Sequence, residues 1–216
     1  MNTRFFTVML VAVMTASAVQ AQFHAGMRGG LNVSGMYGNT IPVIADGPGA
    51  EGKIGAQIGA VGELAMGRVF AVQPGLLFSM AGYTSRSKAG FEEKEMSYQL
   101  NYLQVPLNAL VKLPLGQKAN VFIYLGPYAG YALNGRFKLE QIEDRKVVKT
   151  EKTKVRFGSD GLNRFDAGAG FGLGFQAGAV QFDLGMTMGM MNIHRVKGYD
   201  MKNFNVALAA SYFLGK

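Results

Sequence analysis

The sequence contains no cysteine, no tryptophan and two histidines among its 216 residues. Because cysteine is absent, the chain cannot be a small secreted fold stabilised by disulfides, and it offers neither a thiolate metal ligand nor a thiol nucleophile. Stability must therefore come from packing, from closure of the fold and from the surrounding medium.

Long apolar runs are absent beyond the first 21 residues. Residues 1–21 have the features of a secretory signal peptide: Arg4 in a short basic start, an apolar stretch over Phe5–Ala18, and a small residue at Ala21. No later run reaches 18 apolar residues, so we expect no membrane-spanning helix. The predicted organisation is a signal peptide over 1–21 and one β-barrel domain over 22–216.

The segment Phe165–Met190 alternates between apolar residues and small or polar ones. Period-two patterning is typical of β-strands whose two faces differ chemically. One face is apolar, whereas the other is mainly Gly, with Asp166, Gln181 and Asp183. Such a face suits the crowded interior of a small closed barrel, where we expect the glycines to leave room for larger residues of the far wall.

Eight alternating segments can be recognised, joined by links that are alternately short and long. The short links are 67–68, 114–118 and 176–179. This order is typical of outer-membrane barrels, which have short periplasmic turns and long outer loops. We therefore predict an all-β fold, an eight-stranded antiparallel up-and-down transmembrane β-barrel preceded by a cleaved signal peptide. The segments are approximately 24–36, 53–66, 69–84, 96–113, 119–136, 165–175, 180–192 and 203–214.

Charge is scarce in these segments. Of the 35 charged residues beyond the signal peptide, seven fall within the 115 strand residues and 28 within the other 80. A soluble barrel needs a wetted outer face rich in Lys and Glu, which these strands cannot supply. An apolar outer face suits lipid, and closure removes unpaired edges from the hydrocarbon. We therefore predict an integral protein of the bacterial outer membrane.

Parity assigns residues to the lipid side. We expect the odd positions of 103–113 and 167–175 and the even positions of 180–190 to face lipid, whereas residues 121–125 are apolar on both parities. Because tryptophan is absent, any aromatic girdle must consist of Tyr and Phe. The tyrosine candidates are Tyr37, Tyr83, Tyr124, Tyr131, Tyr199 and Tyr212.

Five polar residues on the inward parity fall near the short-turn end of the barrel. Two of them are cations and two are anions, and unpaired charge in one low-dielectric layer is costly. We therefore predict an internal network of ion pairs and hydrogen bonds that fills the lumen. Acid/base chemistry by Glu63 or Asp183 is the alternative interpretation, but internal ion pairs are expected structurally in small barrels. The network residues are Arg28, Glu63, Gln73, Lys112 and Asp183.

The connection 137–164 carries eight basic and five acidic residues, and residues 140–154 are compatible with a hairpin that extends the barrel. We expect it to neutralise outer-membrane lipid and lipopolysaccharide, and the alternative is a partner-binding protrusion. Nucleic acid is excluded by export and by the lack of a basic stripe interleaved with aromatic residues. The candidate interaction residues are Lys138, Arg145, Lys146, Lys149, Lys152, Lys154 and Arg156.

Three short motifs resemble one known family. Tyr102–Lys112 reads YLQVPLNALVK, Leu125–Gly130 reads LGPYAG, and Phe165–Gly168 reads FDAG. They resemble the Bacteroidetes outer-membrane β-barrel family, the porin-family or PorT-like proteins, over the whole mature chain. The resemblance implies an eight-stranded barrel, and PorT itself is tied to type IX secretion. Outer-membrane barrels usually end on an aromatic residue that the assembly machinery recognises, whereas here three residues follow Phe213.

The sequence thus predicts an integral outer-membrane barrel with a filled lumen, in a structural or surface-interaction role, with no catalysis, metal or cofactor. His24 and His194 lie at opposite ends of the predicted barrel, so we expect no shared site. Two alternatives stay open. One is an accessory component of a secretion (type IX, PorT-like) or transport assembly with a protein partner in the envelope, and the other is a small pore.

Overall fold

The computed structural model describes residues 22–38, 50–89, 92–143, 146–158, 161–195 and 198–215. The predicted signal peptide lies outside these residues. No helix among them is both long enough and apolar enough to cross a membrane. The strands are β1 (Gln22–Tyr37), β2 (Ala50–Met66), β3 (Phe70–Ala89), β4 (Glu92–Leu115), β5 (Ala119–Glu143), β6 (Lys146–Lys154), β7 (Phe165–Ala177), β8 (Val180–Gly189) and β9 (Lys202–Phe213).

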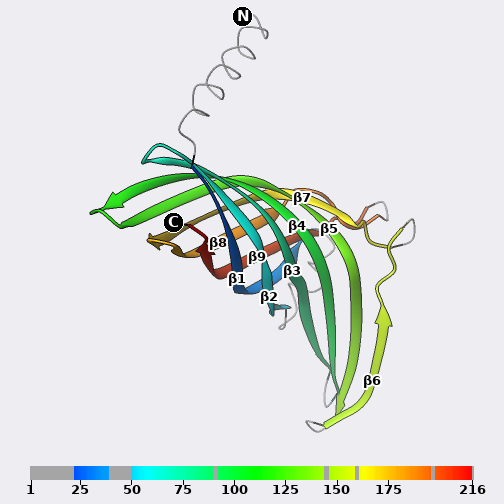
Figure 1. Ribbon diagram of the computed structural model, residues 1–216. Helices are drawn as coiled ribbons and strands as arrows, with labels where there is room; N and C mark the ends of the chain where they lie inside the picture. The colour runs from blue at the N-terminus through cyan, green and yellow to red at the C-terminus, as the bar shows by residue number, and fades with distance from the viewer. Residues whose placement is uncertain are drawn as a thin grey trace, which may run out of the picture.

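Eight strands close into a ring (Figure 1). Each strand pairs antiparallel with its neighbour along the chain, except that β5 continues the ring through β7, because β6 lies outside it. The ring closes where β1 pairs with β9, from Gly26 opposite Phe213 to Tyr37 opposite Lys202. The predicted eight-stranded antiparallel barrel is confirmed, and β6 is a ninth strand beyond it.

The long-loop side of the barrel differs from the sequence prediction. The predicted fourth and fifth segments end near the membrane, whereas β4 and β5 run past the barrel and carry β6 beside them (Figure 1). We expected a connection from residue 137, but residues 137–143 continue β5. The register joins Arg136 to Lys154 and Glu143 to Lys146, so the extension is a hairpin. The hairpin that the sequence allows over 140–154 is therefore present, but it begins earlier, at Arg136, because residues 137–139 continue β5 without the apolar face that marks a span.

The outer surface of the ring is apolar, as parity predicted. On β4, Val105 and Leu107 are 50% and 49% exposed, whereas Leu110 on the other parity is buried. The structure also decides the ambiguous fifth segment: Ile123 and Leu125 face outward, and Phe122 faces inward. An apolar surface of this extent is stable in lipid and not in water.

Two of the six girdle tyrosines were assigned wrongly. Tyr83 is buried and stacks on Tyr98 at 5.1 Å between ring centroids, and Tyr124 points into the lumen. The hydroxyl of Tyr37 donates to the carbonyl oxygen of Gly189. The three tyrosines with at least half-exposed side chains are Tyr131, Tyr199 and Tyr212.

The glycines of β7 and β8 make room for side chains of β5. A Cβ added at Gly172 or Gly185 would overlap the Tyr124 phenol, and one at Gly174 would overlap the Phe122 ring. The rings come from the neighbouring strand β5, which pairs with β7, rather than from the far wall as predicted. The glycines therefore let aromatic rings lie flat against the inner wall.

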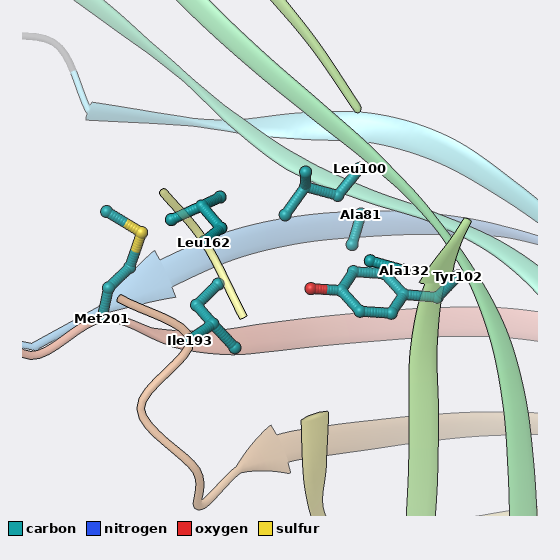
Figure 2. Close-up of a cluster of buried hydrophobic side chains, with 7 residues drawn as sticks. All are labelled: Ala81, Leu100, Tyr102, Ala132, Leu162, Ile193 and Met201. Atoms are coloured by element: carbon teal, nitrogen blue, oxygen red, sulfur yellow. The ribbon is translucent and has the colours of Figure 1, made fainter. Parts of the chain in front are cut away.

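An apolar cap covers the long-loop end of the lumen (Figure 2). Leu162, Ile193 and Met201 come from the long connections and pack against wall residues that include Leu100 and Tyr102. A second contact holds the connection in place, because the Arg164 guanidinium donates to the carbonyl oxygens of Ala132 and Leu133 and lies 4.3 Å from the Phe157 ring centroid. The connections therefore fold over the barrel mouth.

The packing role of Gly185 can be tested by comparison with Gly29, a glycine on the lipid side. Gly185→Val should destabilise the barrel by roughly 1–3 kcal/mol, because its side chain displaces Tyr124. Gly29→Val should have little effect, since an added Cβ there meets no atom within 4 Å. Urea unfolding in phospholipid vesicles measures both variants. Equal losses would contradict the packing role of Gly185.

Candidate functional site

At the short-turn end of the lumen, an ion pair joins β2 and β4. The Lys112 Nζ lies 2.6 Å from the Glu63 Oε1, with the Glu63 side chain fully buried. The same ammonium donates to the Gln176 Oε1 at 3.0 Å. Glu63 and Lys112 line a vestibule of about 840 Å³ at the short-turn end, together with His24.

A second ion pair lies deeper in the barrel. The two terminal nitrogens of Arg28 each lie 2.6 Å from one carboxylate oxygen of Asp183, a bidentate arrangement. Arg28 also donates to the Ser211 Oγ at 3.3 Å, and the Tyr124 hydroxyl donates to Asp183 at 3.3 Å. Arg28 on β1 reaches β8 across β9, where small residues such as Ala209 and Ser211 leave the path open.

The structure brings the five predicted lumen residues into separate contacts rather than one layer. Gln73 on β3 donates to Gln181 on β8 at 3.1 Å. His24 pairs with Glu63 in the β1–β2 register, and Arg28 lies four residues further along β1. Four residues span roughly 13 Å of strand, so the two ion pairs lie at different heights. Parity alone gave no heights, because strand tilt and stagger shift each strand against the next.

A third polar cluster lies beneath the apolar cap. The Asp166 carboxylate, which is 1% exposed, accepts hydrogen bonds from the Tyr128 hydroxyl at 3.0 Å and the Asn203 side-chain amide at 2.8 Å. The same Asn203 amide donates to the Tyr102 hydroxyl at 3.0 Å. This cluster joins β4, β5, β7 and β9.

The ion pairs separate two cavities. A chamber of about 50 Å³, with Arg28 and Gln73 in its lining, lies on one side, and the vestibule with Glu63 and Lys112 lies on the other. The two cavities share no lining residue. Among the described residues, no three His, Asp or Glu side chains come together in a way that could hold a metal ion.

The extension gathers part of the predicted basic set on one face. The register places Lys138 opposite Lys152 and Arg136 opposite Lys154. These residues line a groove of about 450 Å³, which Lys53 also lines while donating to the Ser97 Oγ at 2.7 Å. We call this set the basic face.

Other predicted loop residues lie elsewhere. Lys149 pairs with Glu151 at 2.7 Å, on the opposite parity of β6, and Arg156 lines a different groove beside His194. Lys146 begins β6, and Arg145 lies outside the described residues. The Lys138 ammonium lies 2.7 Å from Glu140 and, as a hydrogen-bond donor, holds the pKa of that carboxyl below its ordinary value.

Comparison with known proteins agrees with this geometry. A family model for the outer membrane protein β-barrel domain matches residues 16–195. The chain belongs to this family. It is an integral outer-membrane β-barrel protein. The last ring strand, β9, lies beyond the matched range, yet it closes the barrel.

Several solved structures are similar to the chain. Ail, the attachment invasion locus protein of Yersinia pestis, is 12% identical with a TM-score of 0.42, covering 89% of this chain and 99% of its own. Neisserial surface protein A is 9% identical with a TM-score of 0.42, covering 87% and 96%. The N-terminal barrel domain of Pseudomonas aeruginosa OprF is 8% identical with a TM-score of 0.31, covering 89% and 100%. No curated protein matches the chain in sequence.

Sequence reasoning missed several members of the barrel's polar groups. Gln176 was assigned to a turn, although it continues the inward parity of Asp166. Tyr124 was assigned to the membrane girdle, although Gly172 beside it signals an inward ring. Arg136 and Lys53 were counted as strand residues, and the even spacing of Arg136 and Lys138 was the signal that could have placed them on one face.

Removal of Asp183 tests the deeper ion pair. Asp183→Ala should destabilise the barrel by about 3–5 kcal/mol, because the Arg28 guanidinium stays buried without its carboxylate. The double variant Arg28→Met, Asp183→Leu should recover most of this loss, because no charge is left unpaired. Urea unfolding in vesicles measures both. A double variant as unstable as the single one would contradict pairing as the cause.

Proposed function

We propose that this outer-membrane barrel is a non-catalytic anchor with a closed lumen, which presents the β4–β5–β6 extension at the cell surface. The observation that carries the proposal is the pairing of lumen charges below a capped mouth, on a barrel whose strands continue beyond the membrane. Paired lumen charges and a covered mouth support a barrel that neither conducts nor catalyses.

The closed lumen is supported by the order of contacts along the axis. The Glu63–Lys112 pair lies nearest the vestibule, the Arg28–Asp183 pair lies deeper, and the apolar cap covers the far end. The Glu63–Lys112 pair joins β2 to β4, and the Arg28–Asp183 pair joins β1 to β8. These strands are not neighbours in the ring, so the paired side chains cross the interior. An ion or solute would have to break these pairs to pass.

Lack of catalysis is supported by how the lumen carboxylates are used. Glu63 and Asp183, the candidates for acid/base chemistry, each hold a buried cation. His24 lines the vestibule, whereas His194 lies beside Tyr199 in an outer connection, with 5.3 Å between ring centroids. A general base needs an available carboxylate or imidazole near a substrate site; both carboxylates are already engaged with cations, and the two histidines lie at opposite ends of the barrel.

We also propose that the barrel is of the Bacteroidetes porin-family, PorT-like type, on the motifs of β4, β5 and β7. An accessory role in a secretion or transport assembly is the second candidate. The observation that favours it is β6, which pairs with β5 on one side and is the last strand of its sheet. Crosslinking from Val148, which is 55% exposed, should capture an envelope protein if this second role holds.

Conductance tests the closed lumen. In planar bilayers the purified barrel should give no stable conductance, because paired charges fill its interior. Glu63→Ala should remain folded and should raise the frequency of brief openings, because it removes the partner of Lys112. Stable, ion-selective channels from the unaltered protein would overturn the closed-lumen proposal.

Surface display can be tested cleanly because the chain has no cysteine. Lys149→Cys, at an exposed position of the extension, should react with a membrane-impermeant maleimide on intact cells. Gln117→Cys, in the short turn between β4 and β5, should react only after the outer membrane is permeabilised. The reverse pattern would contradict the orientation.

A further inference from the structure

We propose that the basic face binds the phosphate groups of outer-leaflet lipid, that is, of lipopolysaccharide next to the barrel. The face consists of Lys53, Arg136, Lys138, Lys152 and Lys154. The inference rests on the proposed function, because it requires the extension to lie on the cell-surface side. It goes further by naming the site and the chemical group that it binds.

The first argument is the register of the hairpin. Lys138 lies directly opposite Lys152, and Arg136 directly opposite Lys154. Like charges that face each other across two strands destabilise a sheet unless an anion lies between them. Two such pairs in succession, beside Lys53, form a row of cations along one groove. Such a row matches a ligand with several negative groups.

The second argument is that the face lacks enough carboxylates of its own. Lys138 forms an ion pair with Glu140 at 2.7 Å. Within the part of the chain that the structure describes, Arg136 and Lys154 form no ion pair, and Lys152 interacts with the Glu140 carboxylate only at longer range. On β4 and β5 the acidic residues of the same parity are Glu93, Glu95 and Glu140, and all three lie at the outer end of the face, beyond Lys138. The end nearer the membrane is therefore cationic.

The third argument is position relative to the membrane. Within the basic face, Arg136 and Lys138 continue the lipid-facing parity of β5, beyond Leu103 and Tyr131, which lie opposite each other and are exposed. Asn101 and Asn134 follow, joined by a 2.7 Å hydrogen bond, and then Gln99 lies opposite Arg136. From Leu103 to Gln99 is roughly 13 Å along the strand, or about 9 Å in height for a strand tilted near 45°.

The headgroup layer adds roughly 5–8 Å on each side of the hydrocarbon core. With Leu103 and Tyr131 as the last lipid-facing pair, Arg136 lies in or just beyond this layer. A bulge at Leu133 in β5 keeps the parity outward at this point, because Asn101 pairs with Asn134 and Tyr102 with Ala132. The β5 cations Arg136 and Lys138 thus lie on the outward face of the sheet, just beyond the lipid-facing belt, on the side where lipid headgroups surround the barrel. Location therefore favours lipid over a soluble polyanion.

The test compares two charge-matched variants of the full-length barrel in detergent micelles. Lys152→Gln with Lys154→Gln removes two cations of the basic face. Lys149→Gln with Arg156→Gln removes two cations from outside it and is the control. Binding of purified lipopolysaccharide is measured for each, at fixed ionic strength. Slower gel migration on heating, a property of folded outer-membrane barrels, verifies that each variant is folded.

We expect the basic-face variant to bind lipopolysaccharide roughly tenfold or more weakly, from the loss of two near-surface cations. The control variant should bind as the unaltered protein does, and Lys152→Arg with Lys154→Arg should retain binding. Chemically dephosphorylated lipopolysaccharide should bind weakly to the unaltered protein and to every variant. This comparison tests the phosphate groups with the unaltered protein alone.

Equal loss in both double variants would overturn the site, as would strong binding of the dephosphorylated lipid. If inorganic polyphosphate binds as tightly as lipopolysaccharide and displaces it, the assignment to lipid is overturned in favour of a soluble polyanion. None of these outcomes bears on surface display, which cysteine labelling decides separately.

Discussion

Closure between β1 and β9 is the constraint on which the rest of the structure depends. Hydrocarbon offers no hydrogen-bonding partner, so every backbone group at membrane depth must be paired within the sheet. The last strand therefore has to return to the first, along a register that runs from Gly26 to Tyr37. Once the ring is closed, each strand has one side in lipid and one side in a narrow interior.

The narrow interior explains the paired charges and the glycines. An eight-stranded ring encloses just enough space for side chains, so a polar residue there has to find a partner from another wall. Arg28 finds Asp183, Lys112 finds Glu63, and Gln73 finds Gln181. Glycines of β7 and β8 admit the Tyr124 ring, whose hydroxyl joins the deeper pair. Outside the membrane the strands no longer need an apolar face, and the β4–β5–β6 extension carries the basic face there.

The sequence allowed the spans to be predicted because a lipid-facing strand must alternate, and alternation is visible residue by residue. Contacts between side chains across the barrel were harder to predict from the sequence. That Arg28 and Asp183 share an interior follows from parity, but which cation meets which anion depends on stagger between strands, which no local pattern encodes. The apolar cap escaped prediction since Leu162, Ile193 and Met201 are isolated apolar residues in long connections. The hairpin over 140–154 could be anticipated from its weak alternation, whereas the unbroken course of β5 through residues 137–139 was hidden by the lack of an apolar face.

Disulfide formation across the β1–β9 seam tests closure most directly, because the chain has no other cysteine. Leu31 lies directly opposite Leu208, and directly opposed Cα atoms in antiparallel strands are about 4.5–5.5 Å apart, within disulfide reach. Leu184 lies one strand further, at roughly 10 Å from Leu31. Leu31→Cys with Leu208→Cys should oxidise to an intramolecular crosslink in the folded protein, and Leu31→Cys with Leu184→Cys should not. Absence of the first crosslink in a folded barrel would contradict the closed ring.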